Sequence, residues 1–251
     1  MDQTSIQAAL RDAVLEQRAN IDAKAEAFLE GKTAPGLAYA VVLDGQVLHA
    51  AGVGATHAAA SAGAADSRAQ RAPDADTVFR IASMTKSFVA AAVLALRDRG
   101  ALRLDDPIDA HIPQLQGMVL PTTDSPMPTV RDLLTMSAGW PTDDPWADRE
   151  ESMAPEEYSA LLTDGFTFNA APGTSFEYSN LGYTMLGRII TNVSGVQFQD
   201  FIRTEILQPL GMTSTGFTAE DVPAQHLADG HFFRDGRWQV EPTSATGEFA
   251  A

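Results

Sequence analysis

The segment Phe79–Leu96, FRIASMTKSFVAAAVLAL, decides the fold because it joins a short extended stretch to a strongly apolar helix. We expect this helix over about residues 83–99, apolar on nearly every side and therefore central, with Gly100 as its cap. Lys86 lies in the first turn of this helix, just before an apolar run over residues 88–96. The position of a basic side chain at the start of a buried helix needs a chemical explanation.

The chain uses lysine rarely, with three lysines (Lys24, Lys32 and Lys86) against fourteen arginines. Lysine, unlike arginine, can lose its proton where burial penalises the charged form. Ser83 lies three residues before Lys86, so on a helix the two side chains share one face, with roughly 5–6 Å between Cβ atoms. A serine hydroxyl is a poor nucleophile until a base takes its proton. The pair therefore predicts a serine activated by an uncharged amine, and the alternative is a lysine whose head reaches solvent.

Two further features support a catalytic interpretation. If the helix begins at Ser83, unpaired backbone N–H groups at its positive end can stabilise an oxyanion. Tyr178 and Asn180 stand two residues apart at a predicted loop-to-helix junction, where both side chains could enter one cleft. Tyr178 could then relay a proton to a leaving group, and Asn180 could hold Lys86 and a substrate carbonyl. The alternative is an N-cap asparagine beside a core tyrosine.

The segments around this core alternate between helix and strand. Apolar residues at helical spacing predict a helix over residues 5–30 that Gly31 ends. Two β-rich runs flank Asp44-Gly45 and predict a type I′ hairpin. Residues 55–76 are poor in residues to bury and are interpreted as a surface loop, and residues 225–251 become strand-like around Asp235-Gly236.

We interpret residues 1–251 as one domain that contains a helical, loop-rich insert at 101–170. Prolines divide the insert into short pieces. Thr129 with Asp132 predicts a capping box. Pro155 fits the first turn of a helix that Gly165 stops, and two more helices are expected after Asn180 and around residues 198–212.

Composition narrows the function classes. The 251 residues carry a formal charge of −16 and are 45% apolar, so we expect neither nucleic acid nor a membrane surface as partner. The absence of cysteine excludes disulfides, thiolate catalysis and cysteine-bound zinc. The histidines lack HExxH spacing, so we expect no metal. No G-x-S-x-G elbow occurs, which argues against an α/β-hydrolase triad. GVGATH is not a G-x-G-x-x-G fingerprint, because His57 takes the place of the third glycine, and we expect no cofactor. With no signal-peptide core in the first thirty residues, we expect a cytoplasmic chain or the mature form of an exported protein.

The stretches FRIASMTKSFVA, TVRDLLTMSAGW, PGTSFEYSNLGYTMLGRII and LGMTSTGF resemble the serine beta-lactamase and penicillin-binding-protein-like superfamily. The nearest branch holds class C beta-lactamases, family VIII esterases and D-amino-acid peptidases, and the resemblance covers about residues 25–251. It implies an α+β fold, in which an antiparallel sheet with flanking helices lies beside a helical subdomain. It also implies that Ser83 is the acylated nucleophile, Lys86 its proton partner, Tyr178 a general base or acid, and Asn180 a ligand of substrate and lysine.

One family motif has no match. The family carries Lys or His, then Ser or Thr, then Gly, on a later strand that also supplies a second oxyanion N–H. Lys32-Thr33 lacks the glycine and precedes the first strand, and TSTG at 213–216 lacks the basic residue. The resemblance therefore implies an incomplete sheet: a second polypeptide supplies the C-terminal part, or the protein has been cut, or the chain is an inactive remnant. The unpaired edge of an incomplete sheet favours pairing with another chain.

Other candidate residues have competing interpretations. Trp140 and Trp146 flank PTDDP and could line a substrate cleft, but ordinary packing explains them equally well. The acidic pairs Asp105-Asp106 and Asp143-Asp144 fit solvated turns better than a metal site.

The sequence is compatible with three functions. The first is a serine hydrolase that forms an acyl-enzyme on an ester, an amide or a D-amino-acid peptide. The second is a binding module that acylates slowly or not at all and senses a beta-lactam or a peptide. The third is a structural fragment that needs its missing strands. The sequence does not separate esterase, beta-lactamase and D-peptidase activity.

Overall fold

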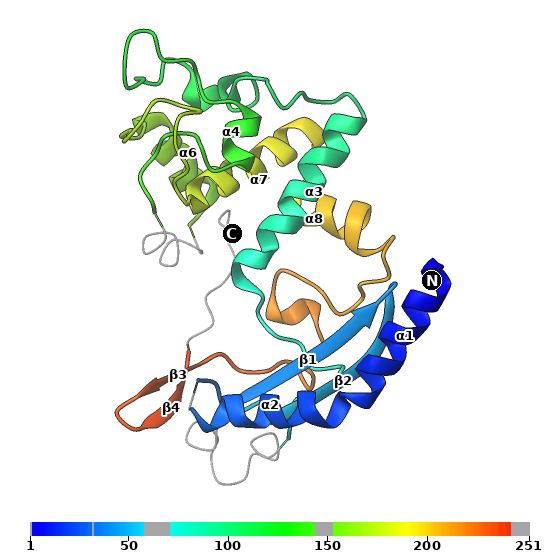
Figure 1. The fold of residues 1–251 in the computed structure, drawn as a ribbon. Coiled ribbons are helices and arrows are strands. Elements are labelled where there is room, and N and C mark those ends of the chain that lie inside the picture. Colours follow the sequence, from blue (N-terminus) through cyan, green and yellow to red (C-terminus); the bar gives the residue numbers. More distant parts are fainter. Residues whose placement is uncertain (1, 32, 58–70, 144–152, 242–251) are drawn as a thin grey trace. The chain divides into compact units, whose positions relative to one another are not determined.

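The computed structural model describes residues 2–31, 33–57, 71–143 and 153–241 (Figure 1). These residues form two compact units, one from the chain up to Arg80 together with the segment from Val222, the other from Ile81–Asp221. The predicted insert at 101–170 falls within the second unit.

In the first unit, helices α1 and α2 pack along a β-hairpin (Figure 1). The elements are α1 Gln3–Glu16, α2 Arg18–Glu30, β1 Gly36–Leu43 and β2 Gln46–Gly54. The single helix predicted over residues 5–30 is interrupted at Gln17, whose N–H donates to both Ala13 O and Val14 O. This shared bond tightens the last turn of α1 and lets α2 begin as a separate helix. Gly31 ends α2 as predicted.

The hairpin turn has the predicted conformation. Asp44 and Gly45 both have positive φ, 49° and 72°, as a type I′ turn requires. The antiparallel register continues from Leu43–Gln46 to Gly36–Gly54, with one irregularity between Val41 and Val42.

One carboxylate ties α2 to both strands of the hairpin. Asp22 Oδ1 accepts a hydrogen bond from the Tyr39 hydroxyl at 2.5 Å and lies 2.6 Å from Nε2 of His49. The hydrogen bond to Asp22, together with burial, raises the pKa of Tyr39 to about 12. The same bond, followed by the contact with His49, lowers the pKa of Asp22. No sequence pattern indicated this three-residue contact.

The later part of the first unit contains a second hairpin. Strands β3 His231–Arg234 and β4 Arg237–Val240 pair antiparallel around Asp235 and Gly236, which both have positive φ. This confirms the predicted strand structure around Asp235-Gly236. Residues 242–251 lie outside the described part. The predicted antiparallel arrangement with flanking helices is confirmed, but the described strands form two separate two-stranded sheets.

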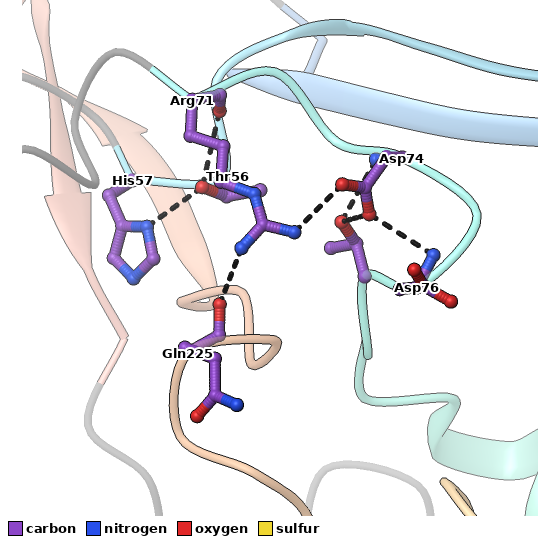
Figure 2. Close-up of polar contacts among 7 residues, drawn as sticks. Thr56, His57, Arg71, Asp74, Asp76 and Gln225 are labelled. Atoms are coloured by element: carbon purple, nitrogen blue, oxygen red, sulfur yellow. Dashed lines mark hydrogen bonds and ion pairs between the residues drawn. The ribbon is translucent and has the colours of Figure 1, made fainter.

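The segment that follows β2 is held to this later part by polar contacts (Figure 2). The Arg71 guanidinium donates to Gln225 O at 2.6 Å and to Asp74 at 2.8 Å. Thr56 donates to Arg71 O at 3.2 Å and its hydroxyl lies 2.9 Å from Nδ1 of His57. The predicted surface loop at 55–76 therefore begins and ends in ordered contacts, and its middle, 58–70, lies outside the described residues.

The second unit is built around two apolar helices, α3 Thr85–Asp98 and α7 Asn180–Ser194, which pack against each other. The helix predicted over residues 83–99 is therefore confirmed as central. At its end the Gly100 N–H donates to Arg97 O and the Ala101 N–H to Leu96 O, which is the Schellman arrangement.

Shorter elements make up the rest of the described second unit. They are η2 Ala82–Met84, η3 Ile108–Ala110, η4 Pro113–Leu115, α4 Val130–Leu134, α6 Pro155–Asp164, α8 Phe198–Ile202, η5 Arg203–Leu207 and η6 Ala219–Asp221. The Thr129–Asp132 capping box and the helix from Pro155 to Gly165 are both confirmed. The single helix predicted around 198–212 is instead α8 followed by the wider π-type turn η5. In the described part of the chain, no helix has the length and apolar character needed to cross a bilayer.

Candidate active site

Ser83 lies in the 3₁₀ turn η2, immediately before α3. The sequence predicted that the helix would begin at Ser83, and the α-helix proper begins two residues later. Ser83 is exposed. The residue before it, Ala82, has a φ of 44°, in the left-handed region that non-glycine residues rarely adopt. Such local strain is common where a fold holds a reactive group at a fixed angle.

Lys86 lies one turn along α3 and is buried, with 6% of its surface exposed. Its Nζ donates to Ser83 Oγ at 3.1 Å and to Asn180 Oδ1 at 2.6 Å. The same nitrogen lies 5.0 Å from the ring centroid of Tyr178 and 5.7 Å from that of Tyr183. The alternative of a lysine that reaches solvent is therefore wrong.

Tyr178 completes the contacts of the serine hydroxyl. Its phenol oxygen lies 2.6 Å from Ser83 Oγ, within hydrogen-bond distance, across 95 residues of sequence. The hydroxyl of Ser83 thus has an amine on one side and a phenol on the other. Both groups can carry a proton, which is the arrangement that general acid–base chemistry at a nucleophile requires.

Asn180 is the first residue of α7 and is buried. The N-cap of this helix is Ser179, whose Oγ accepts from the Gly182 N–H at 3.0 Å. The alternative of an N-cap asparagine is therefore wrong, and the Asn180 side chain instead accepts from Lys86.

Asp143, interpreted from sequence as a solvated turn residue, contacts the start of α7. Its Oδ1 accepts from the Asn180 N–H at 2.8 Å, and its Oδ2 accepts from the Leu181 N–H at 2.8 Å and the Ser179 hydroxyl at 3.1 Å. The turn interpretation of Asp143 is wrong because its carboxylate is used by the helix N-terminus. These partners lie 36 to 38 residues away in sequence, too far for any local pattern to indicate them.

Backbone bonds hold the loop that carries Asp143 against the segment that leads to Tyr178. Ser137 O accepts from the Gly173 N–H at 2.8 Å, and Met136 O accepts from the Glu177 N–H at 2.9 Å. Gly139 O accepts from Asn169 and Ala170. Gly139 has a φ of 92°, and a Cβ there would lie 2.3 Å from Ala170 O. Only glycine fits this close approach.

Trp140 and Tyr183 are both buried aromatic residues. Trp140 is 2% exposed and its ring lies 5.7 Å from Phe166 and 5.9 Å from Phe168, so the structure favours packing over the lining of a substrate cleft. Trp146 lies outside the described residues.

Tyr183, which the sequence did not single out, forms one wall around Lys86, and its hydroxyl donates to Leu134 O at 3.0 Å. Burial, followed by the neighbouring Tyr178, raises the pKa of Tyr183.

Within the described ranges, no group of three or more acidic or histidine side chains is placed to hold a metal ion. Asp105 contacts Arg131, and Asp106 contacts the Arg103 N–H and His111.

Comparison with known proteins identifies the family. The family model described as Beta-lactamase matches residues 21–249. The chain belongs to the beta-lactamase family. The resemblance seen in the sequence motifs is thereby confirmed.

Curated relatives in this family include Protein flp of Staphylococcus aureus strain NCTC 8325, 29% identical over 219 residues. That match covers 86% of this chain and 41% of the relative. Beta-lactamase-like protein 2 of Dictyostelium discoideum is 30% identical over 183 residues, covering 68% of this chain and 32% of the relative. The chain thus spans less than half the length of these relatives.

Several solved structures share the fold of this chain. The octameric penicillin-binding protein homologue from Pyrococcus abyssi is 30% identical with a TM-score of 0.71, and the match covers 88% of this chain and 50% of that one. A class C beta-lactamase is 23% identical with a TM-score of 0.72, covering 93% and 61%. The hydrolase EstCE1 is 19% identical with a TM-score of 0.70, covering 93% and 60%. These last two matches show the fold alone.

Proposed function

We propose that this chain carries the acylation site of a serine hydrolase that forms an acyl-enzyme on an ester or amide carbonyl. The observation that carries the proposal is that Lys86 Nζ and the Tyr178 hydroxyl both lie within hydrogen-bond distance of Ser83 Oγ. Membership of the beta-lactamase family supports it.

In the proposed reaction, Ser83 Oγ attacks the carbonyl carbon and its proton passes to the Tyr178–Lys86 pair. The new Oγ–carbon bond gives a tetrahedral intermediate, which collapses when the leaving group accepts that proton and departs. Water then attacks the acyl-enzyme by the same proton route, which releases the acid and returns the proton to Ser83. Asn180 orients Lys86 by accepting its hydrogen bond.

The substrate is one of three kinds of acyl compound: an ester, a beta-lactam or a D-amino-acid peptide. The choice depends on groups beyond Ser83, Lys86 and Tyr178, including the later-strand motif that the sequence does not show. A companion segment that supplies this motif and adds strands to the sheet stays a prediction.

The direct test compares hydrolysis of p-nitrophenyl esters by the native chain, Ser83→Ala and Ser87→Ala. Ser87 is exposed on the next turn of α3, and its hydroxyl donates to Met84 O at 2.7 Å, so it is a matched control. We expect hydrolysis by the native chain and Ser87→Ala and its loss in Ser83→Ala. Equal rates in all three proteins would reject the proposal.

A second candidate is a binding module that acylates without turnover. The 30% identity to a penicillin-binding protein homologue supports this second candidate function. A stoichiometric gain in mass with a beta-lactam, with no release of product, would select this function over hydrolysis.

A further inference from the structure

We propose that Asp143 is a positioning residue for acylation, which fixes the start of α7 so that Asn180 and Tyr178 hold Lys86 and Ser83 in their reactive geometry. The proposal rests on the proposed function of Ser83. It concerns a residue that touches none of the reacting groups directly and acts through the helix backbone.

The contacts of Asp143 are those of a dedicated helix clamp. Its two oxygens accept from the Asn180 N–H, the Leu181 N–H and the Ser179 hydroxyl at 2.8, 2.8 and 3.1 Å. The first N–H groups of a helix lack intrahelical partners, and a carboxylate there satisfies them and complements the helix dipole. With Gly182 donating to Ser179 Oγ, the first three N–H groups of this 15-residue helix all have acceptors.

This clamp acts on both functional residues of the segment. The backbone N–H held by Asp143 belongs to Asn180, whose side chain receives Lys86 Nζ at 2.6 Å. The hydroxyl held by Asp143 belongs to Ser179, which follows Tyr178 directly. A shift of the helix start would therefore move the amide away from Lys86 and the phenol away from Ser83.

The clamp is itself anchored. Thr142, next to Asp143, donates to Glu177 Oε2 at 2.8 Å, and Glu177 precedes Tyr178. The loop that carries Asp143 is thus bonded to the segment 177–181 at two neighbouring positions, Thr142 and Asp143. The loop and the start of α7 are therefore fixed to each other.

The chemistry of the contact requires a carboxylate rather than an amide. Three groups donate hydrogen bonds to the Asp143 side chain. An ionised carboxylate suits them because both of its oxygens only accept. An asparagine of the same shape would turn an NH₂ group toward one of these donors and lose its bond. Asp143→Asn is therefore a test that preserves size, removes the charge and breaks at least one of the three bonds of the clamp.

The experiment measures two rates in the native chain, in Asp143→Asn and in Thr129→Ala. Thr129 caps a different helix, α4, in the same unit. Thr129→Ala removes this cap and therefore controls for general destabilisation. The first rate is acylation of Ser83 by a fluorophosphonate, read by mass spectrometry. The second is reductive methylation of Lys86 relative to the exposed Lys24, which needs no catalysis.

We expect Asp143→Asn to acylate about 10- to 100-fold more slowly than the native chain. We also expect its Lys86 to methylate faster, because Asn180 no longer holds the amine. Thr129→Ala should match the native chain in both rates. If Asp143→Asn and Thr129→Ala behave alike in both, the positioning role is overturned. If the native chain itself is not acylated while Lys86 methylation still rises in Asp143→Asn, the proposed function fails and the clamp stands.

Amide hydrogen exchange in the native chain gives a reading that does not depend on a variant folding. The amide hydrogens of Asn180 and Leu181 should be as protected as those of Met185 and Leu186 in mid-helix. Exchange at the rate of an unprotected helix start would overturn the proposal.

Discussion

The Tyr178 hydroxyl lies 2.6 Å from Ser83 Oγ, although 95 residues separate the two in sequence. The contact joins the start of α3 to the segment that opens α7, the two helices that form the centre of the second unit. Because these helices pack through buried apolar faces, the pair is held by the core rather than by a mobile loop.

The phenol of Tyr178 should be needed for proton transfer. Tyr178→Phe removes the hydroxyl and keeps the ring beside Lys86, so we expect acylation of Ser83 to fall by about 100-fold or more with little change in stability. Time-quenched reaction with a fluorophosphonate gives the acylation rate, and thermal unfolding gives the stability. Native-like acylation in Tyr178→Phe would assign the proton transfer to another group.

Lys86 should act through a proton that it can exchange rather than through charge alone. Lys86→Arg keeps a positive charge that arginine does not release, and Lys86→Met keeps the length of the side chain without charge. We expect both variants to lose acylation by about 100-fold or more. If Lys86→Arg retained the native rate while Lys86→Met did not, a fixed charge would explain the role of Lys86.

Gly139→Ala should disturb the loop that carries Asp143. An added Cβ would meet Ala170 O at 2.3 Å in a residue whose φ is 92°, so we expect a loss of about 1–3 kcal/mol in the free energy of unfolding, together with slower acylation. Gly165→Ala is the matched control, since Gly165 also has positive φ, 80°, but its added Cβ would contact nothing within 4 Å. Equal losses in both variants would show that backbone strain, not the clash, decides the effect.

The Asp22–Tyr39 contact predicts a stability change in strong alkali. The folded pKa of Tyr39 is about 12, above its ordinary value of 10.0, because the neutral phenol donates to Asp22. A group whose pKa rises on folding stabilises the fold fully below its unfolded pKa, so this contribution is lost as pH increases from about 10 to about 12. The difference in tyrosinate absorbance between the native chain and Tyr39→Phe, followed against pH, measures the pKa of Tyr39. A Tyr39 titration near 10 would contradict the contact.

The sequence predicted the parts of the site that depend on local geometry. Ser83 and Lys86 lie three residues apart, and the turn η2 that leads into the apolar helix α3 brings their side chains within hydrogen-bond distance. The hairpin at Asp44-Gly45 and the capping box at Thr129 are likewise determined by residues within a few positions of each other.

The parts that sequence reasoning missed depend on contacts between distant segments. Asp143 bonds a helix start 37 residues later, and Asp22 bonds two strands, and neither carboxylate has a neighbour in sequence that marks it. The meeting of Tyr178 with Ser83 was expected through the family resemblance, because no periodicity or spacing predicts which loop packs on which helix. Trp140 shows the reverse case, where a residue near the motifs is used for packing.

The most direct test of the central claim is peptide mapping by mass spectrometry after the chain reacts with a fluorophosphonate. We predict one adduct, located on Ser83, that is absent in Ser83→Ala and retained in Ser87→Ala. An adduct that persists in Ser83→Ala, or no adduct on the native chain, would contradict the assignment of Ser83 as the nucleophile.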